Sequence, residues 1–156
     1  MAPINIGIGF DALEKLVQPK LVPDGSYNTM IEKVDESPVQ RTGRPQWRFQ
    51  LRILDRPDLE AQGIRYLFLY AQLPWIDPDT REWDYSNCFT IVDIINTTGM
   101  MIQGAQLPDK EVFFGKPLPV KAEKRVRKGT ETDLDGPTYD NSVKIITKKK
   151  GGGSVS

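Results

Sequence analysis

The chain has no histidine and a single cysteine, Cys88, among its 156 residues. Without imidazole it cannot form a serine–histidine catalytic pair or a histidine metal site, and one thiol cannot close an intrachain disulfide. The apolar runs are too short to span a bilayer, and no leader segment is visible. We therefore expect a non-enzymatic, intracellular protein with no cofactor, no metal and no membrane association.

The 21 basic and 21 acidic side chains balance overall but are unevenly distributed. Residues 41–65 carry six arginines against three carboxylates, and residues 116–128 carry six basic side chains against one carboxylate. Between them, residues 74–111 carry seven carboxylates against two basic side chains. If the two basic segments meet in the fold, they form a face that attracts phosphates. Alternatively, both are solvated strand faces whose cations neutralise neighbouring carboxylates.

The sequence pattern predicts five strands. They cover residues 26–34, 47–53, 65–71, 117–127 and 142–147. The clearest alternation is in the second segment, where Trp47 and Phe49 are separated by Arg48. Residues 65–71 are apolar on both faces, so the alternation does not show which face is buried.

Two helices are also predicted. Residues 87–98 show a helical apolar stripe, with Ser86 as a possible N-cap and Gly99 in the position of a C-terminal glycine. A capping box beginning at Asp11 predicts a short helix near the N-terminus. Five short strands with a helix between the third and fourth favour a mainly β fold, a five-stranded OB-like Greek-key barrel. An SH3-like barrel and a small α+β sandwich are the alternatives.

The same pattern suggests three regions along the chain. Residues 1–22 form a lead-in that contains the short helix, and residues 23–147 form the OB-like domain. Residues 148–156 form a basic, glycine-rich tail, which has the composition of a flexible segment.

Cations and aromatic rings are the remaining candidates for function. Single-stranded nucleic acid binds to cationic grooves with exposed rings on which bases stack, and alternate side chains of a strand share one face. The candidate binding residues are Arg48, Arg52, Tyr66, Phe68, Tyr70, Trp75, Lys121, Arg125, Arg127, Lys128 and Tyr139. The basic segment that ends at Lys128 is the strongest candidate for a phosphate contact.

Each candidate group also has a purely structural interpretation. Arg48 and Arg52 can pair with Glu32 or other strand carboxylates. The row formed by Tyr66, Phe68 and Tyr70 can pack under the 87–98 helix, because a buried helix stripe needs a partner surface. Trp75 and Trp83 can hold the acidic loop against the barrel, although Trp75, Trp83, Tyr85 and Tyr139 all lie in predicted loops, where exposure is common.

Several short segments together resemble a known family. They are residues 22–27, Gly43 with residues 47–54, residues 63–68, residues 91–96 with Gly99, residues 114–120 and residues 141–146. In their order they resemble a phage-encoded family of domains of unknown function that is associated with single-stranded DNA-binding and recombination genes. The resemblance covers roughly residues 20–147. It implies an OB-like barrel and a role on single-stranded DNA in phage replication or recombination, and it supplies no catalytic residues.

Three functions therefore remain open. The first is sequence-tolerant binding of single-stranded DNA through backbone neutralisation and aromatic stacking. The second is a protein-interaction barrel that docks a replication or recombination enzyme without itself binding DNA. The third is a metal-dependent hydrolase with an all-carboxylate site drawn from Asp77, Asp79, Glu82 and Asp84.

Overall fold

The computed structural model describes residues 3–5, 7–10, 21–102, 104–126 and 139–147. Five antiparallel strands form its main sheet. They are β1 (Gly25–Glu36), β2 (Gln46–Ile53), β3 (Tyr66–Gln72), β6 (Pro117–Val126) and β7 (Tyr139–Ile145). The five predicted strands are confirmed, with boundaries that shift by up to three residues. The short helix predicted from Asp11 lies outside the described residues.

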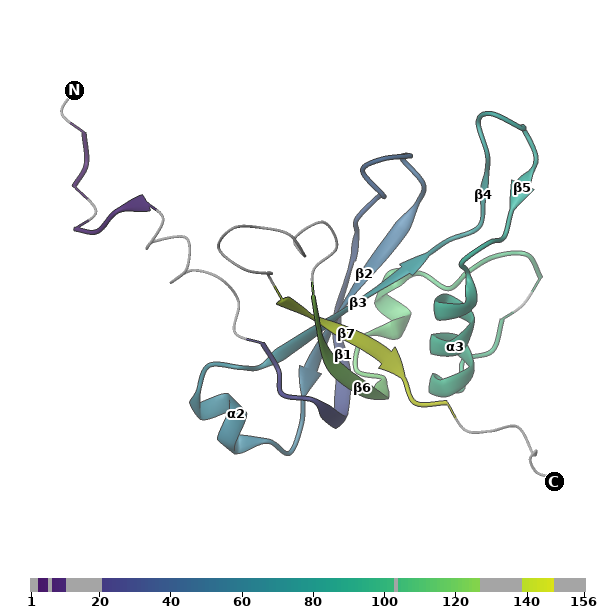
Figure 1. Ribbon diagram of the computed structural model, residues 1–156. Helices are drawn as coiled ribbons and strands as arrows, with labels where there is room; N and C mark the ends of the chain where they lie inside the picture. Colours follow the sequence, from purple (N-terminus) through teal and green to yellow (C-terminus); the bar gives the residue numbers. More distant parts are fainter. Residues whose placement is uncertain (1–2, 6, 11–20, 103, 127–138, 148–156) are drawn as a thin grey trace.

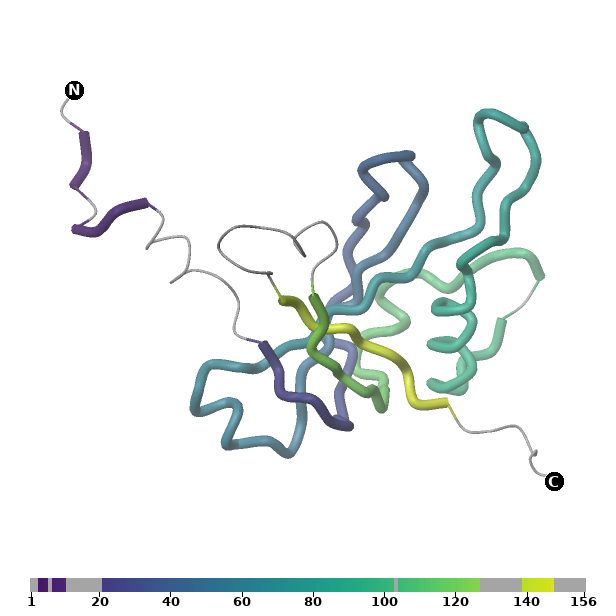
Figure 2. Tube along the Cα trace, in the orientation of Figure 1, coloured from purple at the N-terminus to yellow at the C-terminus, as the bar shows by residue number. Residues whose placement is uncertain are grey.

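The order of strands in the sheet is β3-β2-β1-β6-β7. β1 lies at the centre and pairs with β2 on one side and with β6 on the other, although β6 is distant from it in sequence (Figures 1 and 2). The pairing of β1 with β2 contains a bulge between Ile31 and Lys33. Bulges increase the local twist and bend of a strand. The edge strands β3 and β7 come into contact, but they form no ladder within the described residues, so the described sheet is curved and not closed.

The hydrophobic core lies on the inner face of this curved sheet. Phe49 and Leu51 of β2, Leu67 and Leu69 of β3 and Leu118 of β6 are all buried there. The ring of Phe113 packs edge-on against Phe49, with centroids 5.3 Å apart, and against Trp47 at 5.9 Å. Phe113 belongs to the 3-10 turn η1 (Lys110–Phe113), which lies beside β1. The apolar positions of the alternating strands therefore converge on one core.

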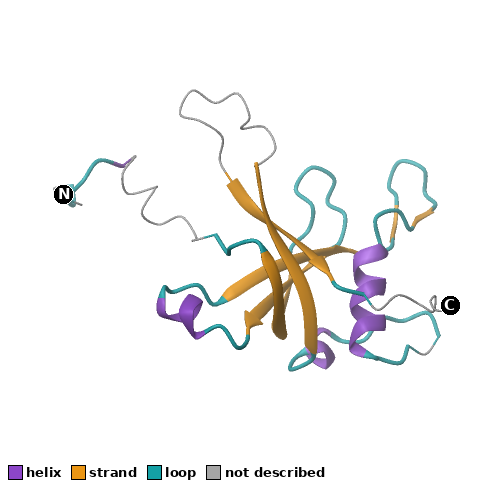
Figure 3. Ribbon diagram, turned by 60° about the horizontal axis from the view of Figure 1, so that its bottom comes forward, coloured by secondary structure: helices purple, strands orange, loops and turns teal. Residues whose placement is uncertain are grey.

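Helix α3 (Phe89–Thr98) lies beside the strands and contacts β3, β6 and β7, and its buried side chains join the same core (Figure 3). Ile91, Ile94 and Ile95 form its buried stripe. Gly99 ends it in the left-handed conformation, with φ 74°, as the glycine predicted. The N-cap is Cys88, without a side-chain capping bond, so the possible Ser86 cap is wrong. Ser86 instead hydrogen-bonds Asp84.

Two small elements lie in segments that showed no clear periodicity. The connection after β2 contains α2 (Pro57–Ala61), a single turn that buries Leu59. The segment after β3 contains a hairpin formed by β4 (Trp75–Ile76) and β5 (Trp83–Asp84), which projects from the sheet near the start of α3 (Figure 1). The α2 helix is too short to show a helical repeat in the sequence, and the two-residue strands β4 and β5 are too short to show alternation.

Candidate functional site

The three aromatic side chains of β3 lie on the outer face of the sheet. Tyr66, Phe68 and Tyr70, here called the ring row, alternate with buried Leu67 and Leu69. Phe68 is 40% exposed and Tyr70 is 50% exposed, whereas Tyr66 is half-buried. Helix α3 covers the opposite face, because it packs in the same core as the two leucines. The interpretation that the ring row lies under the helix is therefore wrong.

Arginines of β2 interleave with the ring row. In the antiparallel register Arg48 lies opposite Tyr70, and Arg52 lies opposite Tyr66. The guanidinium carbon of Arg48 lies 5.2 Å from the ring centroid of Phe68, which is within the range of a cation–π contact. The outer face of β2 and β3 therefore carries cations and rings on neighbouring strands. The sequence placed the two arginines on one face and the three rings on one face, but it left open whether these faces coincide.

These arginines are paired with carboxylates. Arg48 Nη2 lies 3.1 Å from Asp35 Oδ2. Arg52 Nη1 lies 3.7 Å from Glu32 Oε2, and Arg52 Nη2 lies 3.5 Å from Glu60 Oε1. The hydrogen bond from Arg48 lowers the pKa of Asp35, and the same bond raises the pKa of the guanidinium. The alternative in which strand carboxylates neutralise these cations is therefore confirmed, and the face is close to neutral.

The second basic strand, β6, has the same feature. Lys121 lies 3.4 Å from Glu123, and Arg125 Nε lies 2.8 Å from Asp140 Oδ1. Lys124 is placed over the ring of Tyr139, 4.7 Å from its centroid. The two remaining predicted cations, Arg127 and Lys128, lie outside the described residues.

The two basic strands do not converge on one patch. Arg52 is level with Met30 of β1, whereas Lys121 is level with Ser26, on the other side of β1. The step from Ser26 to Met30 corresponds to about 13 Å along the strand, and two strand spacings add about 10 Å across the sheet. The expected single groove between β2 and β6 is therefore not formed by the described residues, because β1 separates the strands and offsets their cations.

The predicted loop aromatics are found in different surroundings. Trp75 is half-buried in β4, which favours a structural role over base stacking. Tyr139 begins β7 and is exposed beside Lys124. Trp83 and Tyr85 are 58% and 64% exposed, and their rings stack with centroids 6.0 Å apart. The sequence suggested that these two rings are exposed, but it gave no sign that they stack.

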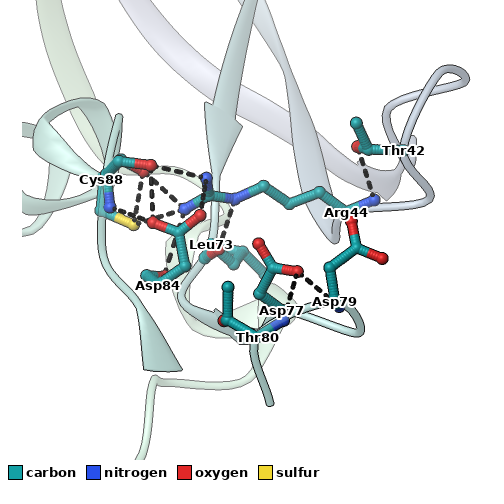
Figure 4. A network of polar contacts seen from close by, with 9 residues as sticks. Thr42, Arg44, Leu73, Asp77, Asp79, Thr80, Asp84 and Cys88 are labelled. Atoms are coloured by element: carbon teal, nitrogen blue, oxygen red, sulfur yellow. Dashed lines mark hydrogen bonds and ion pairs between the residues drawn. The ribbon is translucent and has the colours of Figure 1, made fainter. Parts of the chain in front are cut away.

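A buried arginine that sequence reasoning missed holds the β4–β5 hairpin in place (Figure 4). Arg44, only 6% exposed, donates to the carbonyl of Leu73 and to the carboxylate and carbonyl of Asp84. It also donates to the hydroxyl and carbonyl of Ser86, and one nitrogen lies 3.4 Å from the sulfur of Cys88. No local pattern could have identified this residue, because its partners lie far along the chain.

The carboxylates of the hairpin do not form a metal site. Oδ1 of Asp77 accepts hydrogen bonds from the backbone N–H groups of Asp79 and Thr80, so this carboxylate stabilises the turn. Within the ranges that the structure describes, no group of three or more histidine, cysteine, aspartate or glutamate side chains could hold a metal ion. The same ranges contain no helix with the length and apolarity needed to cross a membrane.

Residues 10–149 match the model of a family described as "Protein of unknown function (DUF669)". The chain belongs to this family. No curated protein matched the sequence. The family description carries no activity, so the function of this DUF669 member is argued below from its geometry.

Proposed function

We propose that this DUF669 protein binds single-stranded DNA, without sequence preference and without catalysis, on the outer face of β2 and β3. The observation that carries the proposal is the partly exposed ring row interleaved with Arg48 and Arg52. Bases of any sequence can stack on such rings, since every base has a flat π-face. The resemblance to phage proteins suggests a role in phage DNA replication or recombination, in the cytoplasm of the host.

The topology supports a specific version of this proposal. We propose that the sheet is a partly open OB-type Greek-key barrel, with the opening between β3 and β7 and with α3 inserted between the third and fourth long strands. Oligonucleotides bind OB barrels on the face of the second and third strands. In this chain those strands are β2 and β3, which carry the arginines and the ring row.

The ion pairs on this face determine how phosphates would bind. The side chains of Arg48 and Asp35 are only 38% and 29% exposed, so their ion pair is half-buried and stronger than the roughly 0–1 kcal/mol typical of a fully exposed pair. A phosphate that replaces Asp35 would have to make comparable contacts with the guanidinium. The displaced carboxylates remain close, and they oppose the approach of the polyanion. We therefore propose that ring stacking supplies more of the affinity than charge does, and that the salt dependence is shallower than about −0.7 per bound phosphate.

Binding of fluorescein-labelled oligo-dT, followed by anisotropy at low salt, tests the proposal. Phe68→Ala and Tyr70→Ala are each expected to weaken binding by about 1–3 kcal/mol, the usual contribution of one stacked base. Tyr85→Ala is the matched control, because it removes a ring from the hairpin that is even more exposed than Phe68 and Tyr70. No binding by the wild type, or equal affinities for all three variants, would refute the proposal.

The other candidate is an interaction barrel that docks a replication or recombination enzyme without binding DNA. The pairing of Arg48, Arg52, Lys121 and Arg125 with carboxylates favours it, since these four cations are less available to phosphates. Failure of the oligo-dT experiment, together with retention of a phage recombination protein on the immobilised chain, would support this function.

A further inference from the structure

A second exposed aromatic surface lies away from the ring row, on the β4–β5 hairpin. It consists of Ile76, Trp83 and Tyr85, here called the hairpin patch, and each of these side chains is more than half exposed. Ile76 and Trp83 are cross-strand partners, and the ring of Tyr85 stacks on that of Trp83. On α3, the next element along the chain, Phe89 and Val92 are two further exposed apolar side chains.

Arg44 holds the backbone that carries the hairpin patch. This buried side chain binds Asp84, which lies between the two stacked rings in sequence (Figure 4). It also binds Ser86, which follows Tyr85. The backbone on both sides of Tyr85 is therefore held before any partner arrives. A preorganised aromatic pair loses little conformational entropy on binding, and tryptophan and tyrosine are enriched among the residues that dominate protein interfaces.

The charge around the hairpin patch differs from that of the sheet, because most of its carboxylates are not neutralised by ion pairs among the residues that the structure describes, as those on β1 are. Asp77, Asp79, Glu82 and Asp93 form no ion pair with any residue in the described part of the chain. Arg81 is the only basic side chain within the hairpin loop. On β1, by contrast, Glu32 and Asp35 are neutralised by arginines. The surroundings of the hairpin patch therefore repel a polyanion and attract a cation.

We propose that the hairpin patch is a docking site for a basic segment of a partner protein, one that carries lysine or arginine beside an apolar side chain. The apolar side chain would pack on Trp83 and Tyr85, while the cations would pair with Asp79 and Glu82 of the hairpin loop. A guanidinium or ammonium group can also lie over the exposed rings. This site is independent of the proposed DNA-binding face, so the chain would bring a protein partner to single-stranded DNA.

Two labelled peptides of equal length test this proposal. One carries a leucine stripe with lysine at every other position, and its counterpart has glutamate in place of each lysine. We expect the lysine peptide to bind and to change the emission of Trp83, which is more exposed than the half-buried Trp47 and Trp75. The glutamate peptide is expected not to bind. Equal binding of both peptides, or binding of neither, would overturn the proposal.

Variants locate the binding site. Trp83→Ala is expected to lower the affinity for the lysine peptide by at least about tenfold, as removal of a central interface aromatic does. Asp79→Asn combined with Glu82→Gln is expected to weaken binding of the lysine peptide and to make that binding less dependent on salt. Tyr70→Ala is the matched control on the sheet and should bind the peptide as the wild type does. Unchanged affinity in Trp83→Ala would overturn the assignment of the site.

Two further measurements distinguish a basic protein segment from two other possible occupants of the hairpin patch, DNA and a second copy of this chain. Trp83→Ala is expected to bind oligo-dT with wild-type affinity, and a loss there would assign the rings to DNA and overturn the proposal. Sedimentation should give the same oligomeric state for Trp83→Ala and the wild type. Conversion of a wild-type dimer to a monomer would instead assign the hairpin patch to a second copy of this chain.

Discussion

Arg48 of β2 reaches diagonally across to β3 and places its guanidinium carbon 5.2 Å from the ring centroid of Phe68. The same guanidinium lies 3.1 Å from the carboxylate of Asp35 on β1. One cation thus links three strands of the outer face and covers part of a candidate stacking ring. The balance between its carboxylate and a phosphate would control DNA binding at this face.

Asp35→Asn is expected to strengthen oligo-dT binding several-fold. The substitution releases Arg48, and also Lys33 at 3.6 Å, from a carboxylate that would repel the phosphates. The slope of log affinity against log salt should become more negative by about 0.7 for each additional phosphate neutralised. Anisotropy titrations at several salt concentrations measure both effects.

Asp140→Asn is the matched control for this experiment. It releases Arg125 in the same way, but on β6, away from the ring row. Its affinity for oligo-dT should therefore stay close to that of the wild type. Equal gains in the two variants would mean that DNA follows the basic strand β6 as well as the ring row.

Arg44→Ala is expected to lower the free energy of unfolding by about 3 kcal/mol, because removing one partner of a buried pair leaves the others unsatisfied. The carbonyls of Leu73 and Ser86 would lose a donor. Arg44→Lys should restore little of this stability, since an ammonium group cannot reproduce the fork of a guanidinium. Urea denaturation provides the measurement, and Arg41→Ala, at an exposed position of the same loop, should leave the midpoint unchanged.

Asp84 is expected to make stability depend on pH in the acidic range. Hydrogen bonds from the hydroxyl and N–H of Ser86, aided by the charge of Arg44, lower its pKa from the usual 3.8. A carboxylate with a lowered pKa in the folded state stabilises the protein above its unfolded pKa, and this stability is lost as the pH falls through the folded value.

Thermal unfolding of Asp84→Asn tests this expectation. The melting temperature of the variant should lie below that of the wild type at neutral pH, and the two should approach each other as the pH falls below about 4. Parallel pH profiles for the two proteins would show that the ionised form of Asp84 contributes nothing to folding.

Phe113→Ala is expected to cost about 3–5 kcal/mol of stability, the range for removing a buried phenylalanine. The ring packs against Phe49 and Trp47 in the middle of the core. Phe114→Ala is the matched control, because the neighbouring ring is exposed and its removal should have a small effect. Similar losses in the two variants, measured by chemical denaturation, would contradict the described packing of η1.

Much of the fold could be predicted from local pattern. Strand β2 was evident because Trp47 and Phe49 alternate with Arg48, and a period of two assigns side chains to opposite faces of a strand. Gly99 indicated the end of α3, because glycine readily adopts the left-handed conformation that ends many helices. The hairpin of Trp75–Ile76 with Trp83–Asp84 gave no such signal, because two-residue strands show no periodicity.

The candidate site was predictable in its residues but not in its electrostatics. Because every second side chain of a strand lies on the same face, the sequence predicted that Tyr66, Phe68 and Tyr70 of β3 share a face. It could not decide which face is covered, since Leu67 and Leu69 on the other side are also apolar. That choice was made by the packing of α3, which is a long-range contact.

The amino-acid sequence by itself determined the five long strands, the placement of Arg48 and Arg52 on one face of β2, the placement of the three rings on one face of β3, and the absence of imidazole chemistry. Only the tertiary structure decided that the arginines and the rings lie on the same face of the sheet, that Asp35 and Glu32 neutralise these arginines, and that Arg44 holds the hairpin through Asp84. The physical reason is that a local repeat depends on neighbours in the chain. Ion pairs between strands and buried hydrogen bonds depend on register and burial, which arise when distant segments pack together.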